Sequence, residues 1–272
     1  MTMCKPFQLL LFHRDYAFSK ACVNGGIDGL IVDFEHKGKD ARQLGFDTEI
    51  NRHSLADLAA IRAIKDAHIL CRINGPDGNA LDAMIREIND VIDAGADEII
   101  VPMIRKFDEA QAVAQAVNRR ARITLMVETR EALDLVADLC ELPIHRIYVG
   151  LNDLRISRQS PSIFAPMIDG TLDAIRADVD HVDFGFGGLT LAGQGSPLPV
   201  AHFVDDLARQ RADFTFLRRS FYRDVGDQCP TQTLDRMRQD IHEARARTSA
   251  KVDLDYNRMR AAVRAIEADQ NA

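Results

Sequence analysis

The feature that most constrains the fold is an alternation of eight short apolar runs with longer stretches of helical spacing. The runs have the length and composition of β-strands. They lie at residues 7–12, 29–33, 68–72, 98–102, 123–128, 147–150, 182–185 and 214–217. Strands that are apolar along their whole length are typical of a parallel sheet covered by helices. The order of the runs therefore predicts an α/β fold.

The stretches between the runs carry apolar residues at the three- and four-residue spacing of amphipathic helices. They lie at residues 54–66, 81–94, 109–118, 130–139, 164–177 and 200–210. Ser54 is placed to cap the first stretch, and Gly95 follows the second. Eight strand–helix repeats within about 220 residues are typical of a (β/α)8 TIM barrel. A doubly wound open sheet is the alternative, but no glycine-rich dinucleotide turn follows the first run.

The end of the chain exceeds what a barrel needs. Two helical stretches, 233–246 and 256–268, follow the eighth run, whereas a barrel requires one final helix. We therefore predict a barrel catalytic domain over residues 1–230 and a C-terminal helical extension over residues 231–272. The apolar positions of the last stretch favour packing against the barrel or a neighbouring subunit, and a solvated tail is the alternative.

Composition limits the classes of partner. The 272 residues are 46% hydrophobic and carry a net charge of −7, which disfavours general nucleic-acid affinity. The Arg218–Arg219 pair and the arginines of 245–247 are interpreted as solvated helix faces or subunit contacts. The five cysteines show no paired spacing, and no segment approaches transmembrane length. We expect a cytoplasmic protein without a membrane or nucleic-acid partner.

Two carboxylates end neighbouring apolar runs, and they are the strongest functional signal in the chain. Glu128 ends the fifth run, and Asp153 follows Gly150 at the end of the sixth. Burying an unpaired carboxylate is costly, so such a residue implies a cation nearby. On successive parallel strands the two carboxylates would share one pocket and hold a divalent metal with open positions. The alternative is that each acid caps the following helix, a role that suits Asp153 better than Glu128.

Other polar residues end the neighbouring runs. Asp33, Glu35 and His36 lie at the end of the second run, Arg72 ends the third, and Asn152 follows the sixth. Because chemistry in a barrel is built at the carboxyl ends of the strands, this convergence favours an active site. Each residue also has a structural alternative. His36 could hydrogen-bond within a loop, and Arg72 could form a structural ion pair with Asp33 or Glu35.

Five motifs carry a family resemblance. They read Val-Asp-Phe-Glu-His at 32–36, Cys-Arg-Ile at 71–73, Gly-Ala-Asp-Glu-Ile-Ile-Val-Pro-Met at 95–103, Val-Glu-Thr-Arg-Glu-Ala at 127–132 and Val-Gly-Leu-Asn-Asp-Leu at 149–154. In this order and spacing they resemble the HpcH/HpaI aldolase/citrate lyase family, the metal-dependent class II pyruvate aldolases. The resemblance extends over roughly residues 7–220 and implies a TIM-barrel lyase.

The resemblance assigns roles to the residues that match the family motifs. Glu128 and Asp153 match the metal-ligand positions, where Mg²⁺, Mn²⁺ or Co²⁺ is held together with water. Arg72 matches the arginine that binds the keto acid and the enolate oxygen. The implied metal cofactor agrees with the chemistry, since a divalent ion stabilises the enolate that carbon–carbon cleavage beside a carbonyl leaves.

The remaining roles concern proton transfer and substrate binding. His36, with Asp33 behind it, matches the acid–base pair of the aldolases. Gly150 and its neighbours, including Asn152, would bind the substrate carboxylate through backbone amides. The resemblance also implies a homo-oligomer, since barrels of this family associate as trimer-based hexamers.

The resemblance implies a lyase that acts on a 2-keto-4-hydroxy acid through a pyruvate-type enolate. The alternatives are a citrate lyase or citrate-synthase-like enzyme that condenses acyl-CoA and keto-acid partners, and a non-catalytic barrel that binds a keto acid. The chain departs from the common pattern in the basic loop 37–42 and in the glycine-rich loop 185–190. Lys37 and Lys39 could meet a substrate carboxylate or phosphate, and solvated lysines are the alternative.

Overall fold

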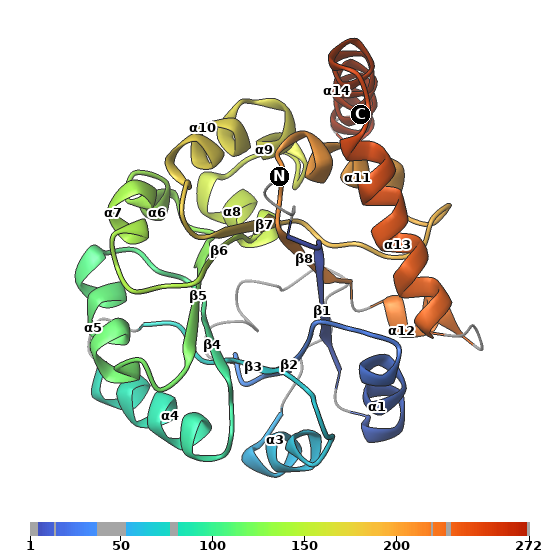
Figure 1. Ribbon diagram of the computed structural model, residues 1–272. Helices are drawn as coiled ribbons and strands as arrows, with labels where there is room; N and C mark the ends of the chain where they lie inside the picture. The colour runs from blue at the N-terminus through green and yellow to red at the C-terminus, as the bar shows by residue number, and fades with distance from the viewer. Residues whose placement is uncertain are drawn as a thin grey trace.

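A computed structural model describes residues 5–13, 15–36, 53–76, 81–218, 220–226 and 230–270. Its eight parallel strands close into a barrel, because β1 pairs with both β2 and β8. The strands are β1 (Gln8–Phe12), β2 (Gly29–Asp33), β3 (Ile69–Arg72), β4 (Glu98–Val101), β5 (Arg122–Val127), β6 (Arg146–Val149), β7 (Asp183–Phe186) and β8 (Phe214–Leu217). Figure 1 shows them as a central ring with helices outside. The predicted (β/α)8 barrel is confirmed, and the open sheet is excluded.

Helices surround the ring. They are α1 (Tyr16–Asn24), α3 (Leu55–Arg62), α4 (Leu81–Asp93), α5 (Phe107–Val117), α6 (Arg130–Leu133), α7 (Val136–Cys140), α8 (Leu151–Arg158), α9 (Ala165–Ile168), α10 (Thr171–Asp178), α11 (Val200–Arg209), α12 (Phe221–Val225), α13 (Pro230–Arg245) and α14 (Ser249–Gln270). Ser54 caps α3 in a reciprocal capping box with Asp57, as its position predicted. The stretch 164–177 is two helices instead of one, because Gly170 turns the chain at a φ of 89°.

The core has two layers, one inside the barrel and one between strands and helices. The inner layer consists of Leu10, Ile31, Leu70, Ile100, Met126, Tyr148, Phe214 and Phe216. Side chains alternate between the two faces of a strand, so positions two residues further along face the same way. On six of the strands this rule leads to Phe12, Asp33, Arg72, Glu128, Gly150 and Arg218. The sequence therefore stacks a layer with four charged side chains, Asp33, Arg72, Glu128 and Arg218, directly on the apolar floor.

The amino-terminal end of the barrel is closed by a buried ion pair. Arg146 and Glu98, the first residues of β6 and β4, are 2% and 0% exposed and bind each other directly. The Glu98 carboxylate also accepts a hydrogen bond from Thr124 and lies 2.9 Å from Nε2 of His68. Arg146 donates to the side chain of Gln8 at 2.7 Å. The residues of this network come from four strands and from the loop before β3. The network therefore links distant parts of the sheet.

The last helix packs against its own barrel. Helix α14 contacts α11 and α9, and Met259 and Val263 on its inner face are buried. Figure 1 shows it at the rim, beside α11 and α13. The apolar face predicted from the sequence thus has a partner within the same chain, and a solvated tail is excluded. The domain boundary at residue 230 stays a prediction. No helix among the described residues is both long and apolar enough to span a membrane.

Candidate active site

A cavity of about 370 Å³ opens at the carboxyl ends of the strands. Five of the predicted site residues line it, namely Arg72, Glu128, Gly150, Asn152 and Asp153. They come from β3 and from the segments that follow β5 and β6. The barrel therefore brings together residues that are up to 81 positions apart in the sequence. This convergence is what the strand-end pattern predicted.

Glu128 is held in the cavity by the backbone of the loop after β4. Its Oε1 accepts a hydrogen bond of 2.9 Å from the N–H of Met103. Met103 has a φ of 59°, a left-handed conformation that costs a non-glycine residue about 1 kcal/mol or more. Thr129, and not Glu128, caps α6 through its hydroxyl group. The capping alternative for Glu128 is thus wrong, and its buried carboxylate faces the cavity.

Asp153 lies in the first turn of α8, where Gly150 is the N-cap residue. The capping alternative is therefore wrong for Asp153 as well. The N–H of Gly150 donates to the carbonyl of Val127 at 3.2 Å, so the prediction that this amide meets the substrate is corrected. What position 150 contributes is space. A Cβ atom there would lie 2.3 Å from Oε2 of Glu128, so only glycine lets α8 begin against that carboxylate.

The carboxylates create an excess of negative charge. Burial raises the pKa of Glu128 well above its usual range, and the charges of Asp153 and Glu35 raise it further. The charge of Arg72 and the Met103 amide oppose this rise but do not cancel it. A divalent cation would offset the repulsion between Glu128 and Asp153. Two carboxylates fit a hard, oxygen-liganded cation that keeps open positions for water and substrate.

Arg72 is anchored by two carboxylates. Its Nε and Nη2 donate to the two oxygens of Asp33 at 2.9 and 2.7 Å, and its Nη1 lies 3.3 Å from Oε2 of Glu35. Its Cζ is 4.9 Å from the centroid of the Phe12 ring. Burial opposes its charge, but Asp33 and Glu35 more than offset this and raise the pKa of Arg72. The structural ion pair exists, and the same guanidinium also lines the cavity.

Asp33 does not lie behind His36 as its hydrogen-bond partner, as the acid–base pair implied by the resemblance would require. Both oxygens of Asp33 are bound by Arg72, whereas Nδ1 of His36 lies 2.9 Å from the carbonyl oxygen of Phe34. The bidentate guanidinium wins because two parallel charge-assisted hydrogen bonds outweigh one bond to an imidazole. His36 is exposed and is not among the residues that line the described cavity. The backbone N–H of His36 donates a hydrogen bond of 3.1 Å to the side-chain oxygen of Asn74.

Comparison with known proteins places this geometry in a family. The sequence profile of the HpcH/HpaI aldolase/citrate lyase family matches residues 10–162, more than half of the 272 residues. The chain belongs to the HpcH/HpaI aldolase/citrate lyase family. The matched region contains all the strand ends that supply Arg72, Glu128 and Asp153.

Individual relatives are more distant. The chain is 32% identical over 98 residues to a 4-hydroxy-2-oxovalerate aldolase of Rhodococcus jostii (strain RHA1), a match that covers 36% of this chain and 31% of that protein. It spans about a third of that relative's length. Two solved structures share the barrel. RipC from Yersinia pestis has a TM-score of 0.55 at 12% identity, with 90% of this chain and 98% of that chain covered. Citrate synthase SbnG has a TM-score of 0.58 at 17% identity, with 86% and 94% covered. At these identities the likeness shows the fold alone.

This HpcH/HpaI family member has site residues that the sequence interpretation missed. Arg218, interpreted as part of a solvated or subunit-contact pair, lines the cavity at the end of β8. The signal was available, because Arg218 lies two residues beyond the inward-facing Phe216. Tyr148 also lines the cavity and donates its hydroxyl hydrogen to the carbonyl of Gly187. Burial raises the pKa of Tyr148 above its usual range. Arg219, Lys37 and Lys39 lie outside the described residues.

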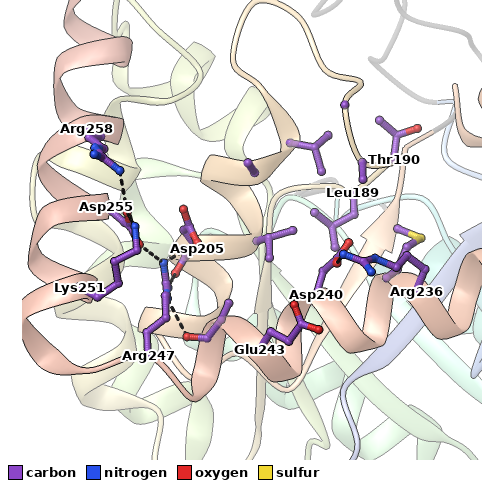
Figure 2. Close-up of a pocket in the computed structure, with 17 residues that line it drawn as sticks. Leu189, Thr190, Asp205, Arg236, Asp240, Glu243, Arg247, Lys251, Asp255 and Arg258 are labelled. Atoms are coloured by element: carbon purple, nitrogen blue, oxygen red, sulfur yellow. Dashed lines mark hydrogen bonds and ion pairs between the residues drawn. The ribbon is translucent and has the colours of Figure 1, made fainter.

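A second cavity, of about 580 Å³, lies outside the barrel between α11, α13 and α14. Figure 2 shows Arg247, Lys251, Asp205 and Asp255 pointing toward one another. Arg247 binds both Asp205 and Asp255, while Lys251 lies 2.7 Å from Asp255. These pairs join opposite charges within the cavity and attach α14 to α11. The residues that match the family motifs, Arg72, Glu128 and Asp153, lie in the other cavity, at the mouth of the barrel.

Proposed function

We propose that the protein is a metal-dependent aldolase that cleaves or forms a 2-keto-4-hydroxy acid through a pyruvate-type enolate. The observation that carries this proposal is the cavity in which Glu128, Asp153 and Arg72 meet. Glu128 and Asp153 would hold Mg²⁺, Mn²⁺ or Co²⁺, hard ions that suit carboxylate ligands. When bound, the cation supplies polarisation of the keto oxygen and charge for the enolate.

Arg72 binds the keto acid in this proposal. Its contacts with Asp33 and Glu35 use three of its five N–H donors, which leaves two for the substrate. Because the guanidinium is planar and locked, these donors are oriented before the substrate arrives. Donors that are preorganised toward a developing oxyanion stabilise it without further rearrangement. Asp33 is then a positioning residue for Arg72.

The segment after β6 binds the substrate carboxylate. The first turn of α8 leaves the backbone N–H groups of Leu151 and Asn152 without a helical acceptor, and both residues line the cavity. Such a helix start favours an anion through its N–H groups and its dipole. Asn152 would add its side-chain amide. Gly150 contributes by allowing this helix start to lie against Glu128.

His36 is proposed as the acid–base group. A carbonyl oxygen only accepts hydrogen bonds, so the contact with Phe34 requires a proton on Nδ1 of His36. In the neutral ring Nε2 then carries no proton and can take one from the hydroxyl group at C4. The C3–C4 bond breaks, its electron pair stays with the keto-acid fragment, and the hydroxyl carbon leaves as an aldehyde or ketone. The Phe34 carbonyl thus provides the orientation that Asp33 was predicted to give.

The test is exchange of the C3 protons of pyruvate in deuterated buffer with Mn²⁺, followed by proton NMR. An enolising aldolase exchanges these protons without any acceptor, whereas a non-catalytic keto-acid binder does not. A Glu128→Gln, Asp153→Asn double variant should lose exchange and Mn²⁺ binding together. A Glu131→Gln, Asp134→Asn variant, with two acids changed in and just after α6, serves as control. Full exchange after exhaustive chelation, or in the double variant, would contradict the proposal.

The condensing-enzyme alternative shares the enolate and differs in the partner. The family name covers both aldolases and citrate lyases. A coupled assay therefore follows pyruvate release from 2-keto-4-hydroxy acids and, in parallel, free CoA release from acyl-CoA with a keto acid. Pyruvate release alone supports the aldolase, and CoA release alone supports the condensing enzyme.

A further inference from the structure

Arg218 differs from the other cation of the active-site cavity in the contacts it makes. Its Nε donates to the carbonyl oxygen of Gly188 at 3.0 Å. Its two terminal nitrogens make no hydrogen bond or ion pair with any residue that the structure describes. Arg72, in contrast, is bound by Asp33 and Glu35. Arg218 therefore brings a positive charge to the cavity together with four unused N–H donors.

Neighbouring residues hold the Arg218 side chain in place. Its Cζ lies 4.9 Å from the centroid of the Phe203 ring, and its backbone N–H donates to Leu189 at 2.7 Å. A Cβ atom at Gly188 would come within 3.2 Å of its Cγ, so the glycine makes room for the side chain. A guanidinium stacked on a ring and bonded through Nε is already ordered. Binding a ligand then costs little further side-chain entropy.

The electrostatic setting favours an anion at this position. Burial lowers the pKa of Arg218, against the opposing influence of Asp224 and Tyr148. The Asp224 carboxylate accepts a hydrogen bond from the hydroxyl of Thr190 and makes no direct ion pair with Arg218. Burial removes part of the water around the Arg218 guanidinium. No carboxylate in the described chain forms an ion pair with it in return. A ligand carboxylate would supply the missing acceptors through two parallel hydrogen bonds.

The order of the strands places Arg218 and Arg72 on opposite flanks of the carboxylate pair. Glu128 and Asp153 follow β5 and β6, Arg72 lies on β3, and Arg218 follows β8. Each arginine is thus two strands from the nearer carboxylate. The floor between them is apolar, with the rings of Tyr148 and Phe216 stacked at 3.8 Å. A ligand anchored at Arg72 can therefore run over this floor toward Arg218.

We propose that Arg218 determines specificity by binding a carboxylate at the end of the substrate remote from the keto acid. The inference rests on the proposed function, which places the keto-acid end at Glu128, Asp153 and Arg72. The aldehyde or ketone fragment released by cleavage then carries the anionic terminus. A carboxylate is the matching group, because a single guanidinium fork pairs with its two oxygens. Arg72 and Arg218 are the basic side chains among the described residues that line the cavity.

The test is a titration of the full-length protein in Mn²⁺ with matched pairs of 2-keto acids of five, six and seven carbons. The members of a pair differ only in whether the far end carries a carboxylate, as in 2-oxoadipate and 2-oxohexanoate. The wild type should prefer the dicarboxylate of at least one pair by roughly 10- to 100-fold, the range of a charged hydrogen-bonded pair. Arg218→Met should bring the two affinities within about threefold of each other, and Arg218→Lys should keep part of the preference.

Arg223→Met is the matched control, because Arg223 follows by five residues and its side chain is 83% exposed. It should keep the wild-type preference. A preference that persists in Arg218→Met, or that is absent from every pair in the wild type, overturns the assignment. Pyruvate proton exchange, which needs no second carboxylate, is measured on the same wild-type sample. Preference without exchange upholds the carboxylate site and contradicts the aldolase proposal, whereas exchange without preference does the reverse.

Discussion

At the scale of single residues, the bidentate pair between Arg72 and Asp33 decides how the site is organised. Arg72 is 39 residues from Asp33 in the chain, yet β2 and β3 place the two residues directly opposite each other. The pair orders the guanidinium and occupies the carboxylate that was predicted to orient His36. The same side chain therefore forms a structural ion pair and lines the cavity.

We expect Arg72→Lys to lose about 10²-fold or more in activity although it keeps the charge. A lysine offers a point charge in place of a planar fork, so it cannot bind both oxygens of Asp33 and still orient donors toward the substrate. The measurement is kcat for pyruvate exchange at saturating Mn²⁺. Arg62→Lys, which changes an arginine paired with Asp97 on the outside of the barrel, is the control. Turnover close to wild type would assign Arg72 a structural role only.

We expect His36→Ala to slow carbon–carbon cleavage by about 10²–10⁴-fold, the range of a positioned acid–base group. Among the described residues the His36 ring contacts the carbonyl oxygen of Phe34 and none of the cavity carboxylates, so binding of Mn²⁺ and oxalate should be nearly unchanged by titration calorimetry. Enolate formation from pyruvate should suffer less than cleavage. His181→Ala changes an exposed histidine elsewhere and serves as control. Loss of metal binding in a folded His36→Ala protein would instead make His36 a ligand.

At the scale of elements, the strands build two polar layers with different tasks. The layer at the carboxyl ends lines the cavity, whereas Glu98 and Arg146 close the amino-terminal end. Burial alone would raise the pKa of Glu98, but hydrogen bonds and charges from His68, Arg146 and Thr124 lower it to about 2. Breaking such a buried pair by removing one partner costs about 3–5 kcal/mol. The lower layer therefore stabilises the sheet that carries the upper one.

The free energy of unfolding should fall in acid because the Glu98 carboxylate of the Glu98–Arg146 pair becomes protonated. A carboxyl group whose pKa is lowered from 4.5 to about 2 on folding stabilises the protein fully above pH 4.5. That contribution, on the order of 3 kcal/mol, is lost as the pH falls toward 2. Urea unfolding between pH 6 and pH 2.5 should show a steeper loss for the wild type than for Glu98→Gln. Glu131→Gln, on α6, should follow the wild type. Parallel curves for the wild type and Glu98→Gln would contradict the role of Glu98.

At the scale of the whole molecule, α14 is the element that the barrel does not require. Its inner face is packed within the chain, where Arg209 lies 4.1 Å from the ring of Tyr256 and Met259 is 1% exposed. Its outer face carries Leu254, which is 47% exposed. A homo-oligomer, trimer or hexamer, stays a prediction, and this outer face is the part of α14 that is available for it.

We expect truncation at Lys251 to lower both the oligomeric state and the melting temperature, because it removes the outer face together with the packed inner face. Leu254→Asp separates the two effects, since it changes an exposed position and leaves Met259 in place. It should dissociate the oligomer in light scattering without a change in melting temperature larger than a few degrees. Met259→Asp changes a buried position, so it should lower the melting temperature of the fold. An oligomer that survives truncation would give α14 a purely internal role.

The sequence alone determined the number and order of the strands and the identity of the carboxylate pair. These are local properties, since a buried strand is read from its own residues and its end from the residue that follows. Glu128, Asp153 and Arg72 could be located because Glu128 and Arg72 end their apolar runs and Asp153 follows the sixth run by three residues. The helices α1, α8 and α12 were not predicted, because in these segments helical spacing is short or interrupted by polar residues.

Only the tertiary structure decided which groups bind each other. Asp33 binds Arg72 from the next strand and not His36 three residues away, and the Gly150 amide donates to the carbonyl of Val127. From the sequence, Arg218 was interpreted as one of two surface arginines. Closure of the barrel sets β8 beside β1, and Arg218 then lines the cavity. The physical reason is that hydrogen-bond partners depend on the register between strands. That register is set by the packing of the whole barrel, which no single stretch of sequence contains.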